Sequence, residues 1–151
     1  MKADPRLLDA VRLALYAANE DLRDGAPHLA VRLSSLFVRR IPRFLAVRIL
    51  EQTEVDARLA ISGELTEHGD ASVGYPDFLH RVRQALSMPS ARRQEACDEA
   101  EARQIADAYL SCLAEELPDA LVAELKAYVP AELKHRLHPR IINPAARPKA
   151  A

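Results

Sequence analysis

Apolar residues recur at intervals of three and four along most of this chain, the spacing that places them on one side of an α-helix. A first helix is expected to begin after Asp4, an N-cap residue that precedes Pro5. Gly25 is expected to end it, because glycine adopts the left-handed conformation of helix ends without strain. The predicted apolar stripe of this helix consists of Leu8, Val11, Leu15, Ala18 and Leu22.

Residues 27–50 are the longest richly apolar part of the chain, and Pro42 divides them. Proline inside a helix removes a hydrogen bond and clashes with the preceding turn. We therefore predict two short helices hinged at Pro42, the first over about 28–40. The segment after the hinge is apolar nearly all round, which indicates burial on more than one side. Its apolar residues are Phe44, Leu45, Val47, Ile49 and Leu50.

A fourth helix is predicted over about 54–67. Thr53 and Asp56 have the spacing of a capping box, with Asp in place of the usual Glu or Gln. Such a helix would pack through Val55, Leu59, Ile61 and Leu65. The sequence HGDASVGYP at 68–76 follows, and its two glycines, its proline and its small polar residues predict a linker.

The second half restarts at Pro76 with a short helix that Pro89 closes. The next helix is expected from about Asp98 to Glu116, because residues 91–104 offer almost no apolar face. Helices at about 119–129 and 131–137 follow. Residues 139–151 hold three prolines and three basic residues without periodicity, which predicts a flexible basic tail.

These elements predict an all-α fold, a compact bundle of seven or eight short-to-medium helices in one domain, 1–138. The halves 1–67 and 76–138 would be joined by the linker. The composition agrees, because only 5% of the 151 residues are aromatic and only four are glycine, which disfavours strands and tight turns.

Charge and cysteine content narrow the function classes. The formal net charge of −1 provides no overall field that would attract DNA or an anionic membrane, so an electrostatic partner must recognise a local patch. Cys97 and Cys112 cannot define a disulfide scaffold in a chain of this length. With no export signal and no uncharged stretch long enough to span a bilayer, we expect a cytoplasmic protein.

The clearest local patch is cationic. Residues 27–50 hold five arginines and no acidic residue. Arg32, Arg39 and Arg43 stand at i, i+7 and i+11, which would align them on one face if a helix ran through the segment. Such a ridge would bind phosphates of a nucleic acid, or lie on an anionic membrane. Alternatively, it is neutralised internally, because residues 51–70 carry six acidic residues and a single arginine.

No residue pattern points to catalysis, a metal or a cofactor. His135 and His138 stand three apart with Glu132 before them, but two imidazoles and a single carboxylate pattern do not make a zinc or dimetal site. The expected alternative is a pair of surface histidines near a helix end. Cys112 falls on an apolar stripe with Tyr109, so it is expected in the core.

The function expected from the sequence is that of a non-enzymatic helical interaction protein, an adaptor, small subunit or self-associating module. It would present an apolar and arginine-rich surface on the helices of 28–50 to a protein partner or to a second copy. The alternative is a nucleic-acid-binding accessory protein that uses the arginine ridge; a membrane surface is less expected, and no small-molecule substrate is evident. The predicted partner-binding residues are Arg32, Arg39, Arg40, Arg43, Phe44 and Arg48.

Overall fold

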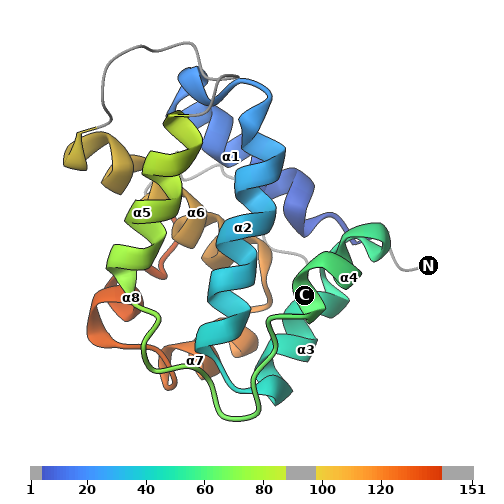
Figure 1. Ribbon diagram of the computed structural model, residues 1–151. Helices are drawn as coiled ribbons and strands as arrows, with labels where there is room; N and C mark the ends of the chain where they lie inside the picture. Colours follow the sequence, from blue (N-terminus) through green and yellow to red (C-terminus); the bar gives the residue numbers. More distant parts are fainter. Residues whose placement is uncertain (1–4, 88–97, 141–151) are drawn as a thin grey trace.

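The structure is a computed structural model that describes residues 5–87 and 98–140. The predicted all-α fold is confirmed, and the described residues form eight α-helices and one 3₁₀ turn (Figure 1). The helices are α1 (Leu7–Ala18), α2 (Gly25–Arg40), α3 (Arg43–Glu51), α4 (Val55–Ser62), α5 (Tyr75–Leu86), α6 (Glu99–Glu116), α7 (Asp119–Lys126) and α8 (Ala131–Arg136), with the 3₁₀ turn at Glu20–Leu22. In these ranges there is no strand, only a single bridge between Pro42 and Thr66.

Four helices form the centre of the bundle. Helix α1 packs against α2 and α6, and α5 packs against the same two helices, so the four close a ring around the core. In Figure 1, α2 and α5 lie side by side, α3 and α4 lie on one flank, and α7 and α8 close the lower end. The two predicted halves contribute to one buried cluster.

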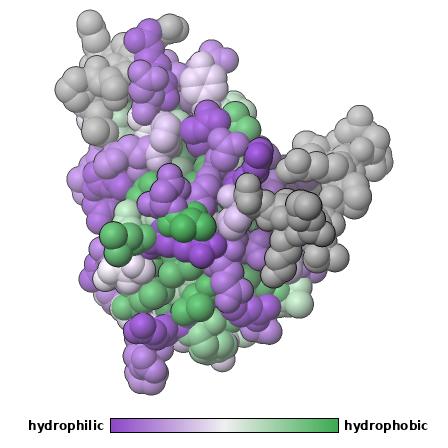
Figure 2. Space-filling view, turned by 90° about the vertical axis from the view of Figure 1, so that its right-hand side faces the viewer, coloured by the Kyte–Doolittle hydropathy of each residue, from purple (hydrophilic) through white to green (hydrophobic). Residues whose placement is uncertain are grey.

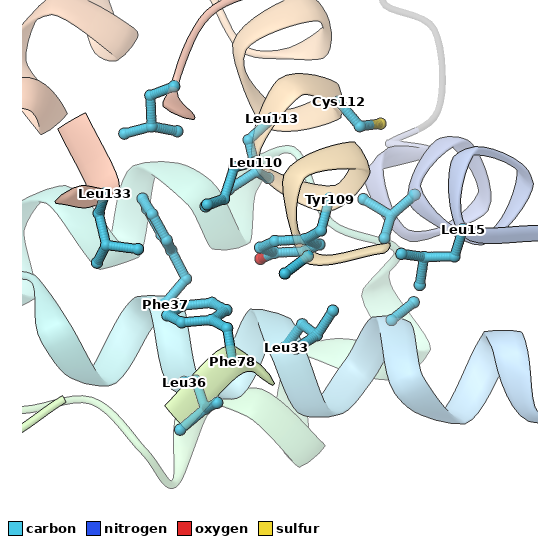
Figure 3. Close-up of a cluster of buried hydrophobic side chains, with 14 of the residues drawn as sticks. Leu15, Leu33, Leu36, Phe37, Phe78, Tyr109, Leu110, Cys112, Leu113 and Leu133 are labelled. Carbon is cyan, nitrogen blue, oxygen red and sulfur yellow. The ribbon is translucent and has the colours of Figure 1, made fainter. Parts of the chain in front are cut away.

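The core is built mainly from aliphatic side chains with a few aromatic ones, as Figure 3 shows for the part around Phe37, Phe78 and Tyr109. Helix α6 has ten buried residues, among them Tyr109, which is only 1% exposed. The Tyr109 hydroxyl lies 3.1 Å from the Ser34 oxygen of α2, so this buried phenol has a hydrogen-bond partner. Cys112 is buried beside it, as its position on the stripe predicted.

Helix boundaries follow the proline and cap signals in part. Ile41 and Pro42 are extended between α2 and α3, so the hinge at Pro42 is confirmed. Helix α6 begins after Asp98, whose carboxylate accepts a hydrogen bond from the Glu101 amide at 2.7 Å, which confirms the start expected there. Asp4, Pro89, Cys97 and the tail residues 141–151 lie outside the described residues.

Gly25 was wrongly expected to end the first helix. Helix α1 ends at Ala18, because the Asn19 backbone is extended and its side chain accepts a hydrogen bond from the Asp21 amide at 2.9 Å. An asparagine side chain that bonds to nearby amides competes with helix continuation. Arg23, with φ of 49°, then reverses the chain, and Gly25 is the first residue of α2.

The predicted fourth helix was wrong in three respects. Helix α4 ends at Ser62 rather than near residue 67. Thr53 does not cap it, since its buried hydroxyl donates instead to the Ile49 carbonyl at 2.9 Å. Val55 and Leu59 are 69% and 85% exposed, because the short helix turns only Ile61 fully into the core.

Residues 63–74 form the loop between α4 and α5, and this loop is held against the end of α2. The Asp70 amide donates to the Arg39 carbonyl at 2.8 Å, and the Thr66 hydroxyl donates to the same oxygen at 3.2 Å. Gly69 has φ of +85°, and a Cβ atom there would lie 2.5 Å from the Arg40 carbonyl oxygen. Glycine is therefore required at this close approach of two backbones.

Candidate functional site

The five arginines of residues 27–50 do not form one ridge. The extended backbone at Ile41 interrupts the helix, so Arg32 and Arg39 belong to α2 whereas Arg43 and Arg48 belong to α3. The alignment of Arg32, Arg39 and Arg43 required a continuous helix and is therefore absent.

Arg39 is neutralised within the molecule. Its Nε lies 2.9 Å from an Asp70 carboxylate oxygen, and its Nη1 lies 3.7 Å from a Glu64 oxygen. Both carboxylates come from the acidic residues 51–70, as the internal-pairing alternative expected. Hydrogen bonds from the Ser72 hydroxyl and amide, assisted by Arg39, hold the pKa of Asp70 below its usual value.

The other arginines have different surroundings. Arg48 forms an ion pair of 2.8 Å with Glu124 of α7, not with residues 51–70. Arg40 is half-buried, and its Nε is buried without a hydrogen-bond partner. The side chain of Arg43 is exposed, and no described residue forms an ion pair or hydrogen bond with it.

Arg32 lies beside an arginine that the sequence analysis did not select. Its Nη2 is 3.1 Å from Gln84 Oε1, and Nη1 of Arg81 on α5 is 3.4 Å from the same oxygen. Arg32, Arg39 and Arg81 line a shallow depression together with Ser35, Leu36 and Glu64. The packing of α2 on α5, which no local pattern specifies, brings these side chains together.

A pair of exposed aromatic residues lies where α3 packs on α7. Phe44 is 55% exposed, Tyr128 is 45% exposed, and their rings meet edge to face with centroids 5.5 Å apart. Val47, one turn along α3 from Phe44, is 38% exposed. We call this surface the α3–α7 patch, and it consists of Arg43, Phe44, Val47, Arg48 and Tyr128.

The expected burial of α3 on more than one side is only partly correct. Leu45, Ala46 and Ile49 lie in the core and Leu50 packs against it, whereas Phe44 and Val47 are exposed. Figure 2 shows the flank of the molecule on which α3 and α4 lie, with several hydrophobic areas set among hydrophilic residues. Helix α3 therefore has one face in the core and a second, partly apolar face at the surface.

The pair His135 and His138 lies at a pocket of about 290 Å³ lined also by Asp107, Ser111, Glu132 and Arg136. Asp107 is already engaged, because it accepts hydrogen bonds from the Tyr75 hydroxyl at 2.6 Å and from Arg136 at 3.0 Å. The Arg136 guanidinium also stacks over the Tyr75 ring at 4.0 Å. Within residues 5–87 and 98–140, no group of three or more His, Cys, Asp or Glu side chains has the arrangement of a metal site.

Three residues that contribute to these surfaces were not predicted from the sequence. Tyr128 falls within the helix predicted over about 119–129, but α7 ends at Lys126, and Tyr128 is 45% exposed with its ring against Phe44. Arg81 and Glu124 gain their roles only through the packing of α5 on α2 and of α7 on α3. Each pairing joins residues more than 40 positions apart, and periodicity in one segment carries no information about it.

Among the helices described, none is both long enough and apolar enough to cross a bilayer. No protein-family model matches the chain, and no curated protein or solved structure matches it either.

Proposed function

We propose that this chain is a non-enzymatic protein-interaction module and that the α3–α7 patch is the surface that binds its partner. The observation that carries the proposal is the half-exposed aromatic pair of Phe44 and Tyr128, with Val47 and the unpaired cation of Arg43 beside it. Interface centres are enriched in tyrosine, phenylalanine and arginine, which supply large contact areas at a low cost in conformational entropy.

The aromatic pair is already ordered before a partner arrives. An edge-to-face contact fixes Phe44 against Tyr128, and the neighbouring ion pair of Arg48 and Glu124 ties the same two helices together. When a partner covers this surface, the side chains of this chain would lose little conformational freedom. The entropy cost of binding would therefore be lower, and the affinity for a given buried area higher. The unpaired guanidinium of Arg43 favours a carboxylate of the partner at the edge of the patch.

A photo-crosslinking experiment with a matched control tests the proposal. Tyr128 and Tyr16 are both 45% exposed, but Tyr16 lies on α1, outside the patch. Either tyrosine is replaced by the photoreactive analogue benzoylphenylalanine, the full chain is expressed in cells of its source organism, and adducts are identified by mass spectrometry. We expect one defined protein adduct from position 128 and none from position 16.

The crosslinked peptide identifies the partner's contact segment, which is expected to contain apolar residues and a carboxylate. The Phe44→Ser variant should remove the adduct from position 128. The proposal is wrong if position 128 gives no adduct, or if positions 128 and 16 give the same ones.

The nucleic-acid alternative has one supporting observation, the two arginines that share Gln84. Arg32 and Arg81 have no carboxylate partner in the described part of the chain, so their charges are available to phosphates. A gel-shift titration at low and moderate salt tests it. Binding that weakens with salt and is lost in the double variant R32A/R81A would support this alternative, and no binding at low salt would eliminate it.

A further inference from the structure

Helix α3 carries a line of three residues with a simple charge pattern along its solvent face. Arg43, Val47 and Glu51 stand at i, i+4 and i+8, so they follow one another along the same side. All three side chains are exposed. Like Arg43, the carboxylate of Glu51 has no ion pair or hydrogen bond with any described residue.

Both charges stand at the end of the helix that disfavours them. Arg43 is the first residue of α3, where the helix dipole is positive, and Glu51 is the last, where it is negative. A helix with this arrangement is less stable than one with the two charges exchanged. The Arg58 guanidinium donates to the Glu51 carbonyl at 3.3 Å and so places a cation at the negative end of α3, but it forms no ion pair with the Glu51 carboxylate. At the positive end, no described residue pairs with the Arg43 side chain.

We propose that a second copy of this chain is the partner of the α3–α7 patch and packs its α3 antiparallel to this one, with a twofold axis close to Val47. The inference rests on the proposed function, because it names the partner of the same surface. Antiparallel packing brings Arg43 of each copy to Glu51 of the other. It also places each charge next to the oppositely charged helix end of the second copy.

The spacing fits this arrangement. The two charged residues are eight positions apart, which corresponds to about 12 Å along the helix axis. A twofold rotation about Val47 exchanges the ends of the line, so both ion pairs form at once and Val47 meets Val47. Parallel packing would instead set arginine against arginine and glutamate against glutamate.

The rest of the patch flanks the line. Phe44 and Tyr128 would cover one side of the α3–α3 contact in each copy, so the twofold brings two aromatic pairs to the interface. Helix α3 has only nine residues, and an interface centred on it is smaller than a standard one. The expected dimer is therefore weak, with a dissociation constant of roughly 10 to 100 μM.

Charge reversal in the full-length chain tests both the partner and the orientation. Sedimentation equilibrium should show that the wild type dimerises, and that Arg43→Glu and Glu51→Arg each weaken the dimer about tenfold, because either change turns two attractive contacts into two repulsive ones. An equal mixture of these two variants should regain the wild-type affinity. The double variant R43E/E51R should regain it as well.

Two controls separate this result from general effects. Glu20→Arg has the same charge change as Glu51→Arg on the exposed 3₁₀ turn, and should leave the dimer unchanged. Thermal unfolding of R43E and E51R at low concentration checks that both variants are folded, so that a weaker dimer reflects the interface and not unfolding.

A wild type that stays monomeric to about 1 mM overturns the second-copy inference. So does a dimer that the reversals leave intact, or a mixture of the two variants that does not reassociate. The proposed function fails by a different result, the lack of an adduct from position 128. An adduct with another protein, found with a monomeric wild type, would keep the proposed function and remove this inference.

Discussion

The carboxylate of Glu54 is predicted to stabilise α1 from a distance of 46 positions in the sequence. Its two oxygens accept hydrogen bonds from the Leu8 amide at 2.9 Å and from the Asp9 amide at 2.8 Å. These amides lie in the first turn of α1 and have no partner within the helix. Arg6, at the N-cap position, provides no side-chain cap, so Glu54 takes over this role.

The magnitude follows from these two bonds. A hydrogen bond to a charged group contributes about 1.5–3 kcal/mol when it is buried, and a helix cap typically about 1 kcal/mol. Because Glu54 is only partly buried, water replaces part of the loss, and we expect Glu54→Ala to reduce the free energy of unfolding by roughly 2 kcal/mol. In a chain of this size, this corresponds to a fall in Tm of about 4–8 °C.

Urea unfolding followed by far-UV circular dichroism measures this free energy. Glu54→Gln keeps one acceptor oxygen without the charge, so it should lose about half as much as Glu54→Ala. Glu67→Ala is the matched control, because the Glu67 carboxylate is exposed and has no hydrogen bond to a described residue. A Glu54→Ala variant within about 0.5 kcal/mol of the wild type would refute the capping role.

Three further predictions concern the core and the loop after α4. Gly69→Ala should lower the free energy of unfolding by about 2 kcal/mol in urea, because φ is +85° and the new Cβ would meet the Arg40 carbonyl. Phe37→Ala should cost about 3–5 kcal/mol by leaving a cavity at a side chain that is 1% exposed, a loss that the same titration measures. Burial raises the pKa of Tyr75 and of Tyr109, with a hydrogen bond to a carboxylate adding to the effect at Tyr75. The stabilisation is complete below the unfolded pKa of about 10 and is lost above it, so unfolding free energy should fall by about 1.4 kcal/mol per pH unit for each tyrosine, and Tyr109→Phe should halve the slope.

The helical fold was predictable because its signals are local. A proline fixes its own φ and lacks an amide hydrogen, so Pro42 interrupts the helix in any surroundings. Asp98 caps α6 with an oxygen that reaches an amide three residues ahead, again without help from the rest of the fold. Where an element depended on such a contact, its boundary was predicted within a few residues.

The errors arise where distant residues compete with a local pattern. Thr53 and Asp56 had capping-box spacing, but Thr53 is buried at the end of α3, and its hydroxyl bonds to the Ile49 carbonyl. The intervening Glu54 is drawn to the first turn of α1. Helical spacing of apolar residues likewise indicates that they share a face, but it does not indicate that another element covers that face. Val55 and Leu59 of α4 have such a spacing and are nevertheless exposed.

The candidate site shows the same division between local and distant effects. The charge of residues 27–50 was evident from the sequence, but the surface that these residues form depends on residues 64–70 of the loop between α4 and α5. This loop supplies hydrogen-bond donors to the Arg39 carbonyl at the end of α2, and two carboxylates to the Arg39 side chain. One segment therefore closes the helix and neutralises its last exposed cation.

The carboxylates of this loop neutralise Arg39 of α2, but they do not neutralise Arg43, which lies on the other side of the hinge at Pro42. Arg43 begins a new helix on the other side of Pro42, and no carboxylate of the loop pairs with its side chain. The Glu51 carboxylate at the end of the same helix has no ion pair with a described residue either, so these two charges do not balance each other within one copy. The charges of residues 27–50 and 51–70 cancel in the sequence. One short helix can nevertheless carry a cation at its first residue and a carboxylate at its last residue, neither in an ion pair with a described residue. That separation, together with the exposed ring of Phe44, is the reason we propose α3 as a binding element.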